Sequence, residues 1–329
     1  MAESWILIRK SNNEEVSCLW VGGFFNYCNN KLMKRLLTML LMAATIGCLE
    51  ASAAITDVQD EQEGQYCLKN GNLTMLIDAA HGGKILSFKY DDKEVLSQLK
   101  WPESFGSTFW TSPQKEWYWP PVPEYDKKAY TVEKDGDVLK MTSEVNDKLK
   151  FRMRKEFKTD AQDQSIVITY YLINESDETK NVAPWEITRV QNEGGLIFFE
   201  APADSIWPAG LMNFKDAYQA AWFTTDEAGE NRKVNADGTG WLAYCNNGLL
   251  LVKRFADLEA NQPAPGEAEI QVYLNRGKTY IELESQGAYT TLQPKEELSW
   301  TVRWYLVPCD GAAEPSEALL KKAKSLVNR

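Results

Sequence analysis

The side chains best able to do chemistry in this sequence are a few glutamates, one histidine and a group of tryptophans. The single histidine, His81, excludes a site built from several histidines and an acid–base pair of two histidines. Any Ser-His-Asp triad would have to use His81. Because His81 precedes Gly82 and Gly83 at a turn, two interpretations stay open: a hydrogen-bonded turn residue or a ligand-binding side chain.

Glu186 lies in an apolar run with Pro184, Trp185 and Ile187. A carboxylate in such a run either points into a lined cleft or forms a buried ion pair. In a cleft, burial would raise the pKa of Glu186 and make it a candidate general acid. In an ion pair, its role would be structural.

The segment between Trp101 and Tyr125 is rich in both tryptophan and proline. Its tryptophans are Trp101, Trp110, Trp117 and Trp119, and its prolines are Pro102, Pro113, Pro120, Pro121 and Pro123. Because proline disfavours helices and central strands, this composition predicts a long stiff loop. One or two of the indole rings could stack on the apolar face of a sugar ring. The alternative is that the tryptophans fill the core at one end of the fold.

The composition limits the classes of partner. The 329 residues include 47 acidic and 36 basic side chains, for a net charge of −11, which argues against a nucleic-acid backbone as a partner. A hydrophobic content of 44% and an aromatic content of 12% describe a packed protein. We expect a monomer with no cofactor and no metal site.

Residues 33–53 are typical of an export signal. Lys34 and Arg35 form a basic start, and residues 36–46 are apolar over a length too short to span a bilayer comfortably. Residues 51–53 match a small-x-small cleavage site, and the alternative is a lipoprotein anchored at Cys48. Residues 1–32 precede this signal, and we interpret them as an extension from a start codon assigned too far upstream. We therefore expect a periplasmic or secreted protein with no transmembrane segment in residues 54–329.

Three cysteines follow the expected cleavage site: Cys67, Cys245 and Cys309. An odd number allows at most one disulfide with one thiol left over, so the chain is not a disulfide scaffold. Small buried side chains are the expected state of all three.

Alternation of apolar and polar residues recurs from Leu73 to near the C-terminus and predicts strands. The expected strands cover residues 73–77, 84–90, 94–96, 131–133, 138–141, 149–154, 165–172, 195–200, 240–244, 249–254, 269–274, 279–284 and 299–307. Residues 165–172 are β-branched and aromatic throughout, which indicates a central strand. One long helix is expected at residues 314–327. These elements predict an all-β fold, a large antiparallel β-sandwich formed by residues 54–329 as a single domain, with a C-terminal helix packed on its edge.

Three segments of the sequence resemble the galactose-mutarotase (aldose 1-epimerase) superfamily. They are HGGKILSF at residues 81–88, the strand, turn and strand at residues 169–189, and LESQ, LQP and WYL within residues 283–306. The chain resembles even more closely an uncharacterised group of exported Bacteroides-type proteins, a domain of unknown function with this fold. That resemblance rests on GSTFW (106–110), WYWPP (117–121), PWEITR (184–189) and ELESQG (282–287). It implies a mutarotase-like supersandwich with affinity for sugars.

The resemblance also implies roles for individual residues. The glutamate of the mutarotase Leu-Glu-Thr-Gln motif is the general base, and it falls on Glu284. The histidine that supplies the proton in that family would lie near Arg189 and Val190, where no histidine is present. A second, substrate-binding histidine is also missing, from the region replaced by residues 110–119. Arg189 is a poor proton donor but can hydrogen-bond a sugar, so half of the mutarotase machinery is absent.

Two functions remain open at this stage. The first is an exported carbohydrate-binding protein that holds a mono- or oligosaccharide on a concave sheet face. Its ligand-binding residues would be Trp110, Trp117, Trp119, Arg189, Gln286 and His81, together with Glu186 and Glu284.

The second is a carbohydrate-active enzyme, aldose epimerase-like or glycan-cleaving, with Glu284 as base and Glu186 as acid. Carboxyl groups about 5–5.5 Å apart would indicate retaining chemistry, and about 6.5–9.5 Å inverting chemistry. Carboxyl groups that face away from one another would exclude the mechanism that uses both glutamates.

Overall fold

The computed structural model describes residues 54–57, 64–101, 104–227, 229–310 and 313–329. The expected export signal at residues 33–53, the extension at residues 1–32 and Cys48 lie outside these residues. Within them, no helix has the length and apolar character needed to cross a membrane.

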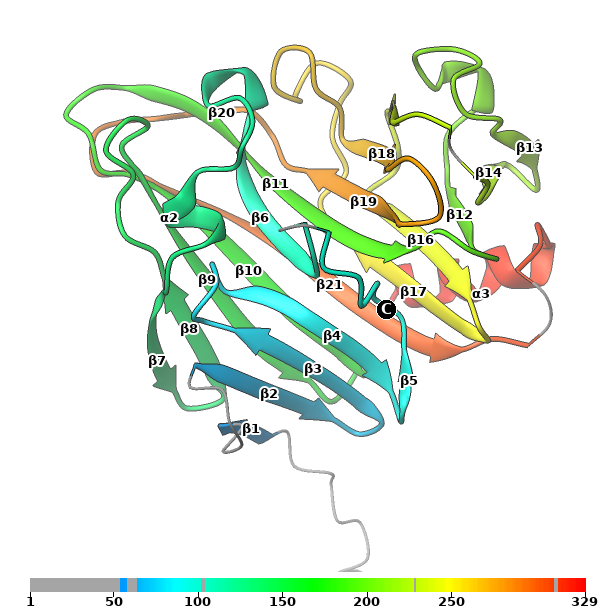
Figure 1. Cartoon of the computed structure of the whole chain (residues 1–329), viewed down its shortest axis with the longest axis horizontal. Helices are drawn as coiled ribbons and strands as arrows, with labels where there is room; N and C mark the ends of the chain where they lie inside the picture. The colour runs from blue at the N-terminus through cyan, green and yellow to red at the C-terminus, as the bar shows by residue number, and fades with distance from the viewer. Residues whose placement is uncertain (1–53, 58–63, 102–103, 228, 311–312) are drawn as a thin grey trace, which may run out of the picture. The chain divides into compact units, whose positions relative to one another are not determined.

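Two large antiparallel sheets form the fold (Figure 1). The central path of the first runs β1-β2-β3-β4-β6-β11-β19-β18-β15, with β5 paired to β4 and β20 to β11. Its strands are β1 (Ala54–Asp57), β2 (Gln65–Asn70), β3 (Leu73–Asp78), β4 (Lys84–Tyr90), β5 (Lys93–Glu94), β6 (Ser107–Ser112), β11 (Lys180–Gln191), β15 (Arg232–Ala236), β18 (Ile270–Leu274), β19 (Tyr280–Gln286) and β20 (Thr290–Leu292).

The second sheet runs β13-β14-β12-β16-β17-β21-β10-β9-β8-β7. Its strands are β7 (Thr131–Asp135), β8 (Val138–Thr142), β9 (Phe151–Asp160), β10 (Ser165–Asn174), β12 (Leu196–Phe199), β13 (Lys215–Ala217), β14 (Ala220–Thr224), β16 (Trp241–Asn246), β17 (Leu249–Arg254) and β21 (Glu297–Pro308). The remaining elements are the short helices η1 (Gln114–Glu116), α2 (Pro123–Asp126) and η2 (Ala203–Ser205), and the longer helix α3 (Glu317–Val327).

A continuous apolar core joins the facing surfaces of the two sheets. The ring of Phe109 on β6 stacks on that of Tyr170 on β10 with 4.2 Å between centroids. Phe88 on β4 meets Trp304 on β21 edge to face at 5.6 Å. The predicted all-β sandwich is therefore confirmed, and so is the central position of residues 165–172, because β10 pairs with both β9 and β21.

Helix α3 confirms the predicted C-terminal helix but not its predicted place. It begins after the N-cap Ser316, whose hydroxyl accepts a hydrogen bond from the main-chain N–H of Leu319 at 3.3 Å. The buried residues of the helix join a second apolar cluster with Trp241 and Leu250 on the outer face of the second sheet. The helix thus covers a sheet face near β16 and β17, which are interior strands, and not a sheet edge (Figure 1). Its apolar side chains need a broad apolar surface, which an edge does not provide.

The tryptophan- and proline-rich segment is not the continuous loop that its composition predicts. Residues 107–112 form β6, a fully buried strand that pairs with β11 and β4. The prolines of the segment lie outside β6, so every backbone N–H within the strand can join the ladder. This correction places Trp110 on a sheet, while Trp101 and Trp119 remain on the connections that flank it.

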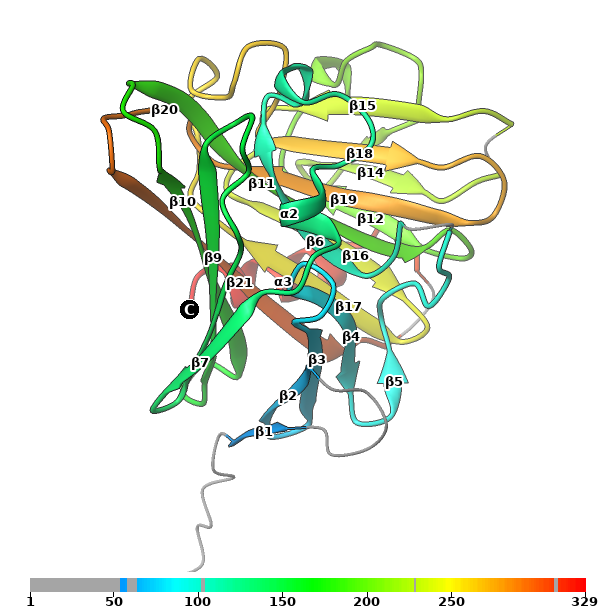
Figure 2. The ribbon, with the colours of Figure 1, turned by 60° about the vertical axis from the view of Figure 1, so that its left-hand side comes forward.

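Alternation along β11 sends neighbouring side chains to opposite faces of the first sheet. Glu186 points inward, where it accepts hydrogen bonds from Tyr170 and Trp304 of the second sheet. Trp185 points outward, where its ring lies 5.5 Å from that of Trp110. Figure 2 shows β11, β19, β18 and β15 side by side in this sheet, and their outward side chains form the floor of the site described next.

Candidate functional site

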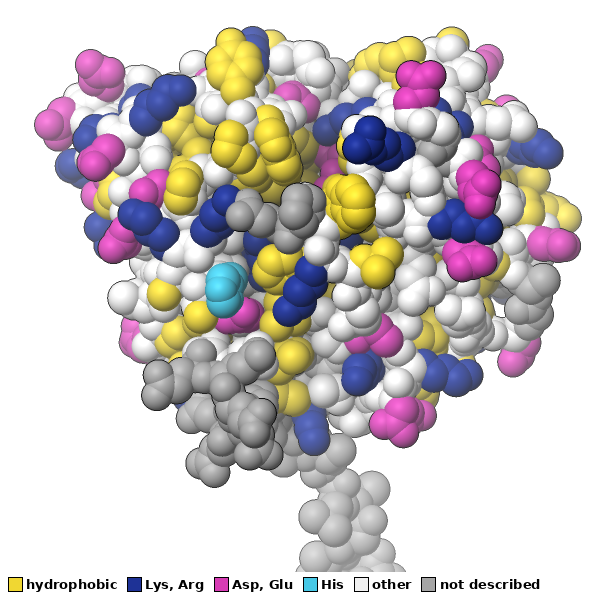
Figure 3. All heavy atoms as spheres, in the orientation of Figure 1, with side chains coloured by type: hydrophobic (Ala, Val, Ile, Leu, Met, Phe, Trp, Pro, Cys, Tyr) yellow, Lys and Arg dark blue, Asp and Glu magenta, His cyan; other side chains and the backbone are white. Residues whose placement is uncertain are grey.

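A cleft of about 480 Å³ lies on the outward face of the first sheet. Its lining residues are Trp101, Ser104, Trp110, Gln114, Trp119, Trp185, Asn231, Lys233, Tyr273, Asn275, Tyr280, Glu282 and Glu284. Figure 3 shows hydrophobic side chains gathered over β6 and the segment that follows it, beside a hollow in which acidic side chains are visible. The cleft therefore combines an aromatic wall with a polar floor.

The aromatic wall consists of tryptophans at different depths. Trp119 and Trp101 are 63% and 48% exposed, so their faces are open to a ligand. Trp110 is buried and meets Trp117, Trp119 and Trp185 edge to face, with centroids 5.5–6.3 Å apart. Trp117 does not line the cleft; it packs behind Trp110 and donates its N–H to the carbonyl of Thr111 at 2.9 Å. Trp110 and Trp117 thus fill an apolar cluster, as the second interpretation expects, whereas contact of Trp101 or Trp119 with a sugar stays a prediction.

A buried ion pair fixes the wall from behind. Asp126 accepts hydrogen bonds from the Trp110 indole at 3.0 Å and the Thr108 hydroxyl at 2.8 Å, and its other oxygen binds Lys84 Nζ at 2.9 Å. Burial opposes ionisation of Asp126, but Lys84 and the two hydrogen bonds hold its pKa below the usual value. Trp110 is therefore positioned by a charged group whose own partner lies in the core.

Glu284 lies at the floor of the cleft and is 1% exposed. Its Oε2 accepts hydrogen bonds from the Trp185 indole at 2.9 Å and from Lys233 Nζ at 2.8 Å. Burial raises the pKa of Glu284 to about 7, the Lys233 ammonium opposes this increase, and the charge of Glu282 adds to it. A carboxyl group that changes protonation near neutral pH suits general acid–base chemistry.

Arg189 and Gln286 stand behind the lining and do not form part of it. Arg189 is buried and forms an ion pair with Glu282 at 2.8 Å, and its guanidinium lies 5.6 Å from the ring of Tyr280. Gln286 accepts a hydrogen bond from the Ser112 hydroxyl at 2.7 Å and donates to Gln271 at 2.9 Å. In this structure both residues position others and do not themselves face the cleft.

Glu186 does not join Glu284. It is fully buried between the sheets, where its Oε2 lies 2.7 Å from Nζ of Lys253, which is also fully buried. Lys253 also donates to the Thr188 hydroxyl at 3.0 Å. Of the two expectations for Glu186, the structure forms the buried ion pair. The two-glutamate mechanism is thereby corrected, because β11 directs Glu186 away from the face that carries Glu284.

His81 lies outside the cleft, in a separate hollow lined also by Asp78, Lys100 and Phe105. Its Nδ1 is 2.8 Å from an oxygen of Asp78, whose other oxygen accepts from the main-chain N–H of Ala80. These contacts are those of a turn residue, and the structure does not bring His81 to the tryptophans.

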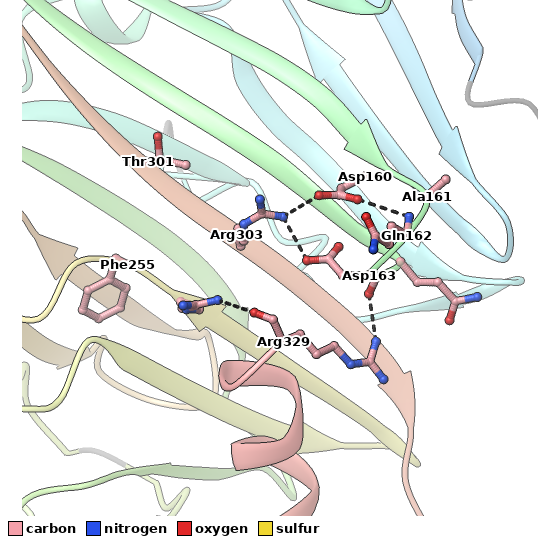
Figure 4. Close-up of a pocket in the computed structure, with 10 residues that line it drawn as sticks. Asp160, Ala161, Gln162, Asp163, Phe255, Thr301, Arg303 and Arg329 are labelled. Atoms are coloured by element: carbon pink, nitrogen blue, oxygen red, sulfur yellow. Dashed lines mark hydrogen bonds and ion pairs between the residues drawn. The ribbon is translucent and has the colours of Figure 1, made fainter.

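A larger hollow of about 860 Å³ lies on the outer face of the second sheet. Figure 4 shows Arg303 directed toward Asp160 and Asp163, with both N···O distances at 2.9 Å. The Arg254 guanidinium donates a hydrogen bond to the main-chain oxygen of Arg329. The Arg329 guanidinium donates in turn to the main-chain oxygen of Asp163. The guanidinium groups that line this hollow thus already bind other groups of the protein. The one aromatic ring in its lining, Phe255, is buried. We therefore assign the candidate site to the smaller cleft.

The comparisons with known proteins agree with this architecture. No protein-family model and no curated protein matches the sequence. A proposed aldose 1-epimerase from Escherichia coli K12 is 14% identical, with a TM-score of 0.56 over 74% of this chain and 99% of that one. A galactose mutarotase-like protein from Lactobacillus casei is 13% identical, with a TM-score of 0.52 over 74% and 100% of the two chains. A proposed aldose 1-epimerase from Klebsiella pneumoniae is 10% identical, with a TM-score of 0.54 over 80% and 84%.

The chain has the galactose mutarotase-like fold. At these identities the likeness establishes architecture and leaves the reaction open. Membership in the exported Bacteroides-type group stays a prediction, since no family model matches. The galactose mutarotase-like fold of this chain carries Glu284 on β19 at the cleft floor, and no histidine lines the cleft beside it.

Sequence reasoning missed most of the polar floor. Lys233 lies on β15, a strand that was not expected because its surroundings are short and polar. The available signal was a brief alternation in which the buried Val234 and Ala236 follow the polar Lys233 and Asn235 in turn. Tyr273 and Glu282 lie on strands that were predicted. Because side chains two residues apart share a face, alternation along these strands could have placed both residues on the face that carries Glu284.

The first prediction concerns the protonation of Glu284. Because Trp185 donates to its carboxylate, we expect tryptophan fluorescence to change with a midpoint near pH 7, and E284Q to lack this component. K233M should move the midpoint to higher pH, since the Lys233 charge favours the carboxylate. A fluorescence titration from pH 4 to 9, as a difference between wild type and E284Q, measures both. An identical titration in E284Q would contradict the assignment.

The same shift predicts a dependence of stability on pH. The native Glu284 holds a proton up to about pH 7, whereas the unfolded chain releases it near 4.5. The free energy of unfolding contributed by this group therefore falls as pH rises from 4.5 to 7, and E284Q should remove that contribution in urea denaturation.

The third prediction separates Glu186 from the site. K253M leaves the buried carboxylate without its cation and should lower the free energy of unfolding by about 3–5 kcal/mol. The double variant E186Q/K253M removes both charges and should recover most of this loss. Urea denaturation measures the effect, with K233M as the control at a pair whose lysine is 31% exposed. A loss below about 1 kcal/mol in K253M would contradict the role given to the pair.

Proposed function

We propose that the cleft binds a carbohydrate. The observation that carries the proposal is the pairing of exposed indole faces, on Trp101 and Trp119, with a floor of hydrogen-bonding groups around Glu284. Sugar rings present apolar C–H faces and polar edges, which match such a wall and floor. The cleft volume lies within the range of small-molecule sites.

The charges of the floor support the same proposal. Lys233 at the floor is paired with Glu284, and Arg189 behind it is paired with Glu282, so each of these two cations already has an anion. Amide and hydroxyl groups of Asn231, Asn275 and Tyr273 add donors and acceptors. Such a floor suits a ligand rich in hydroxyl groups. The names of the similar structures, which include aldose 1-epimerase and galactose mutarotase-like protein, point to the same ligand class.

Titration of the protein with a panel of mono- and oligosaccharides, followed by tryptophan fluorescence and calorimetry, tests this proposal. We expect W119A and W101A each to weaken binding by roughly 5- to 10-fold, the loss of one stacking contact. W207A is the matched control, because Trp207 is 43% exposed but does not line the cleft. Absence of a saturable response to every sugar, or equal loss in W207A, would contradict the proposal.

A second candidate function is catalysis on the bound sugar with Glu284 as the base. It is favoured by the raised pKa of Glu284 within an open cleft. Polarimetry with α-D-glucose and α-D-galactose distinguishes the two functions. Catalysis predicts accelerated mutarotation that falls at least about 100-fold in E284Q. Binding alone predicts the spontaneous rate in both proteins, with affinity for the sugar retained in the wild type.

A further inference from the structure

Two cysteines that are distant in sequence meet beneath helix α3. Sγ of Cys245 lies 3.1 Å from Sγ of Cys309, and 64 residues separate them along the chain. Cys245 is 2% exposed and Cys309 is 7% exposed, and both belong to the apolar cluster that α3 covers. The separation exceeds an S–S bond by only about 1 Å.

The backbone holds both cysteines in place without help from the sulfur atoms. Cys245 lies in β16, paired with Leu196 of β12 and with Leu250 of β17. A two-residue turn with positive φ at Asn247 and Gly248 joins β16 to β17. The main-chain N–H of Cys309 donates to the carbonyl of Gly248 at 2.8 Å, which ties the end of β21 to this turn. The two thiols are therefore brought together by sheet geometry alone.

We propose that Cys245 and Cys309 form a structural disulfide when the chain meets a disulfide oxidant such as oxidised glutathione. The Cys309 thiolate attacks one sulfur of the oxidant and releases one glutathione thiolate. The Cys245 thiolate then attacks the mixed disulfide and releases the second. The protein loses two hydrogens, and one oxidised glutathione becomes two reduced molecules, so electrons and protons balance.

The surroundings of Cys309 favour its role as the attacking thiol. The hydrogen bond from the Cys245 thiol and the nearby Lys322 ammonium lower its pKa, against the effect of burial. The export signal expected at residues 33–53 would also deliver the chain to a compartment where disulfides persist.

The bond would close a loop that contains β18 and β19, the strands that carry Tyr273, Glu282 and Glu284. Cross-linking a loop of this length restricts the unfolded chain. The oxidised protein should therefore melt at a temperature higher than the reduced protein by roughly 5–15 °C.

The test uses the full chain, incubated natively and also refolded in a mixture of oxidised and reduced glutathione. Free thiols are blocked with N-ethylmaleimide, and peptides are mapped by mass spectrometry. We expect a cross-linked pair of peptides containing Cys245 and Cys309, with Cys67 not linked to either. In C245A, Cys309 should react with N-ethylmaleimide, while C67A should retain the cross-link. Dithiothreitol should lower the melting temperature of the wild type but not that of C245A/C309A.

Two results would overturn the proposal. One is complete labelling of Cys245 and Cys309 by N-ethylmaleimide under both conditions. The other is a cross-link from either cysteine to a different partner. Each is read from the peptide map, so the outcome does not depend on whether a variant folds well.

Discussion

The period-two alternation of β11 is the constraint on which the rest of the structure depends. Because the strand is buried on both faces, its residues serve two different environments in turn. Trp185 and Arg189 support the cleft, while Glu186 and Thr188 bind Lys253 in the core. A shift of one residue in register would place a carboxylate in the cleft and an indole on the lysine, so the site and the core can form only in the same register.

Ion pairs lie on both faces of the sheet that contains β11, but their surroundings differ. Glu186 and Lys253 satisfy one another where no water reaches, and their value is mainly the avoided cost of a lone buried charge. Glu284 and Lys233 line the cleft, where Lys233 is 31% exposed and Glu284 is buried beneath it. The same chemical pair lies in the closed core on one face of the sheet and lines a cleft on the other.

Most of the strands could be predicted from sequence, because burial on one face leaves alternation that is visible in the residues themselves. The alternation of β3 and β8 is an example, and the amphipathic pattern of α3 identified the helix in a similar way. The face to which Glu186 points was not predictable, because every neighbour on β11 is buried and no alternation distinguishes the two sides. β6 was not predicted because the segment between Trp101 and Tyr125 is rich in proline. Its prolines all lie outside residues 107–112, so they do not prevent a strand there. Lys233 was missed because its position depends on pairing between β15 and β18, which are far apart in sequence.

Trp110 is hydrogen-bonded to Asp126, which is paired with Lys84. This part of the cleft wall must therefore evolve together with the core, whereas the rest of the wall can vary separately. Replacing Trp110 would disturb a buried charge, so this ring is tied to the stability of the whole fold. Among the described residues, no hydrogen bond joins the Trp101 or Trp119 side chain to a buried charge, and both rings are exposed. Homologous chains could exchange these two rings and so change the surface of the cleft without redesigning the interior. An engineer who wishes to alter the cleft would therefore replace Trp101 and Trp119 first and keep Trp110 unchanged.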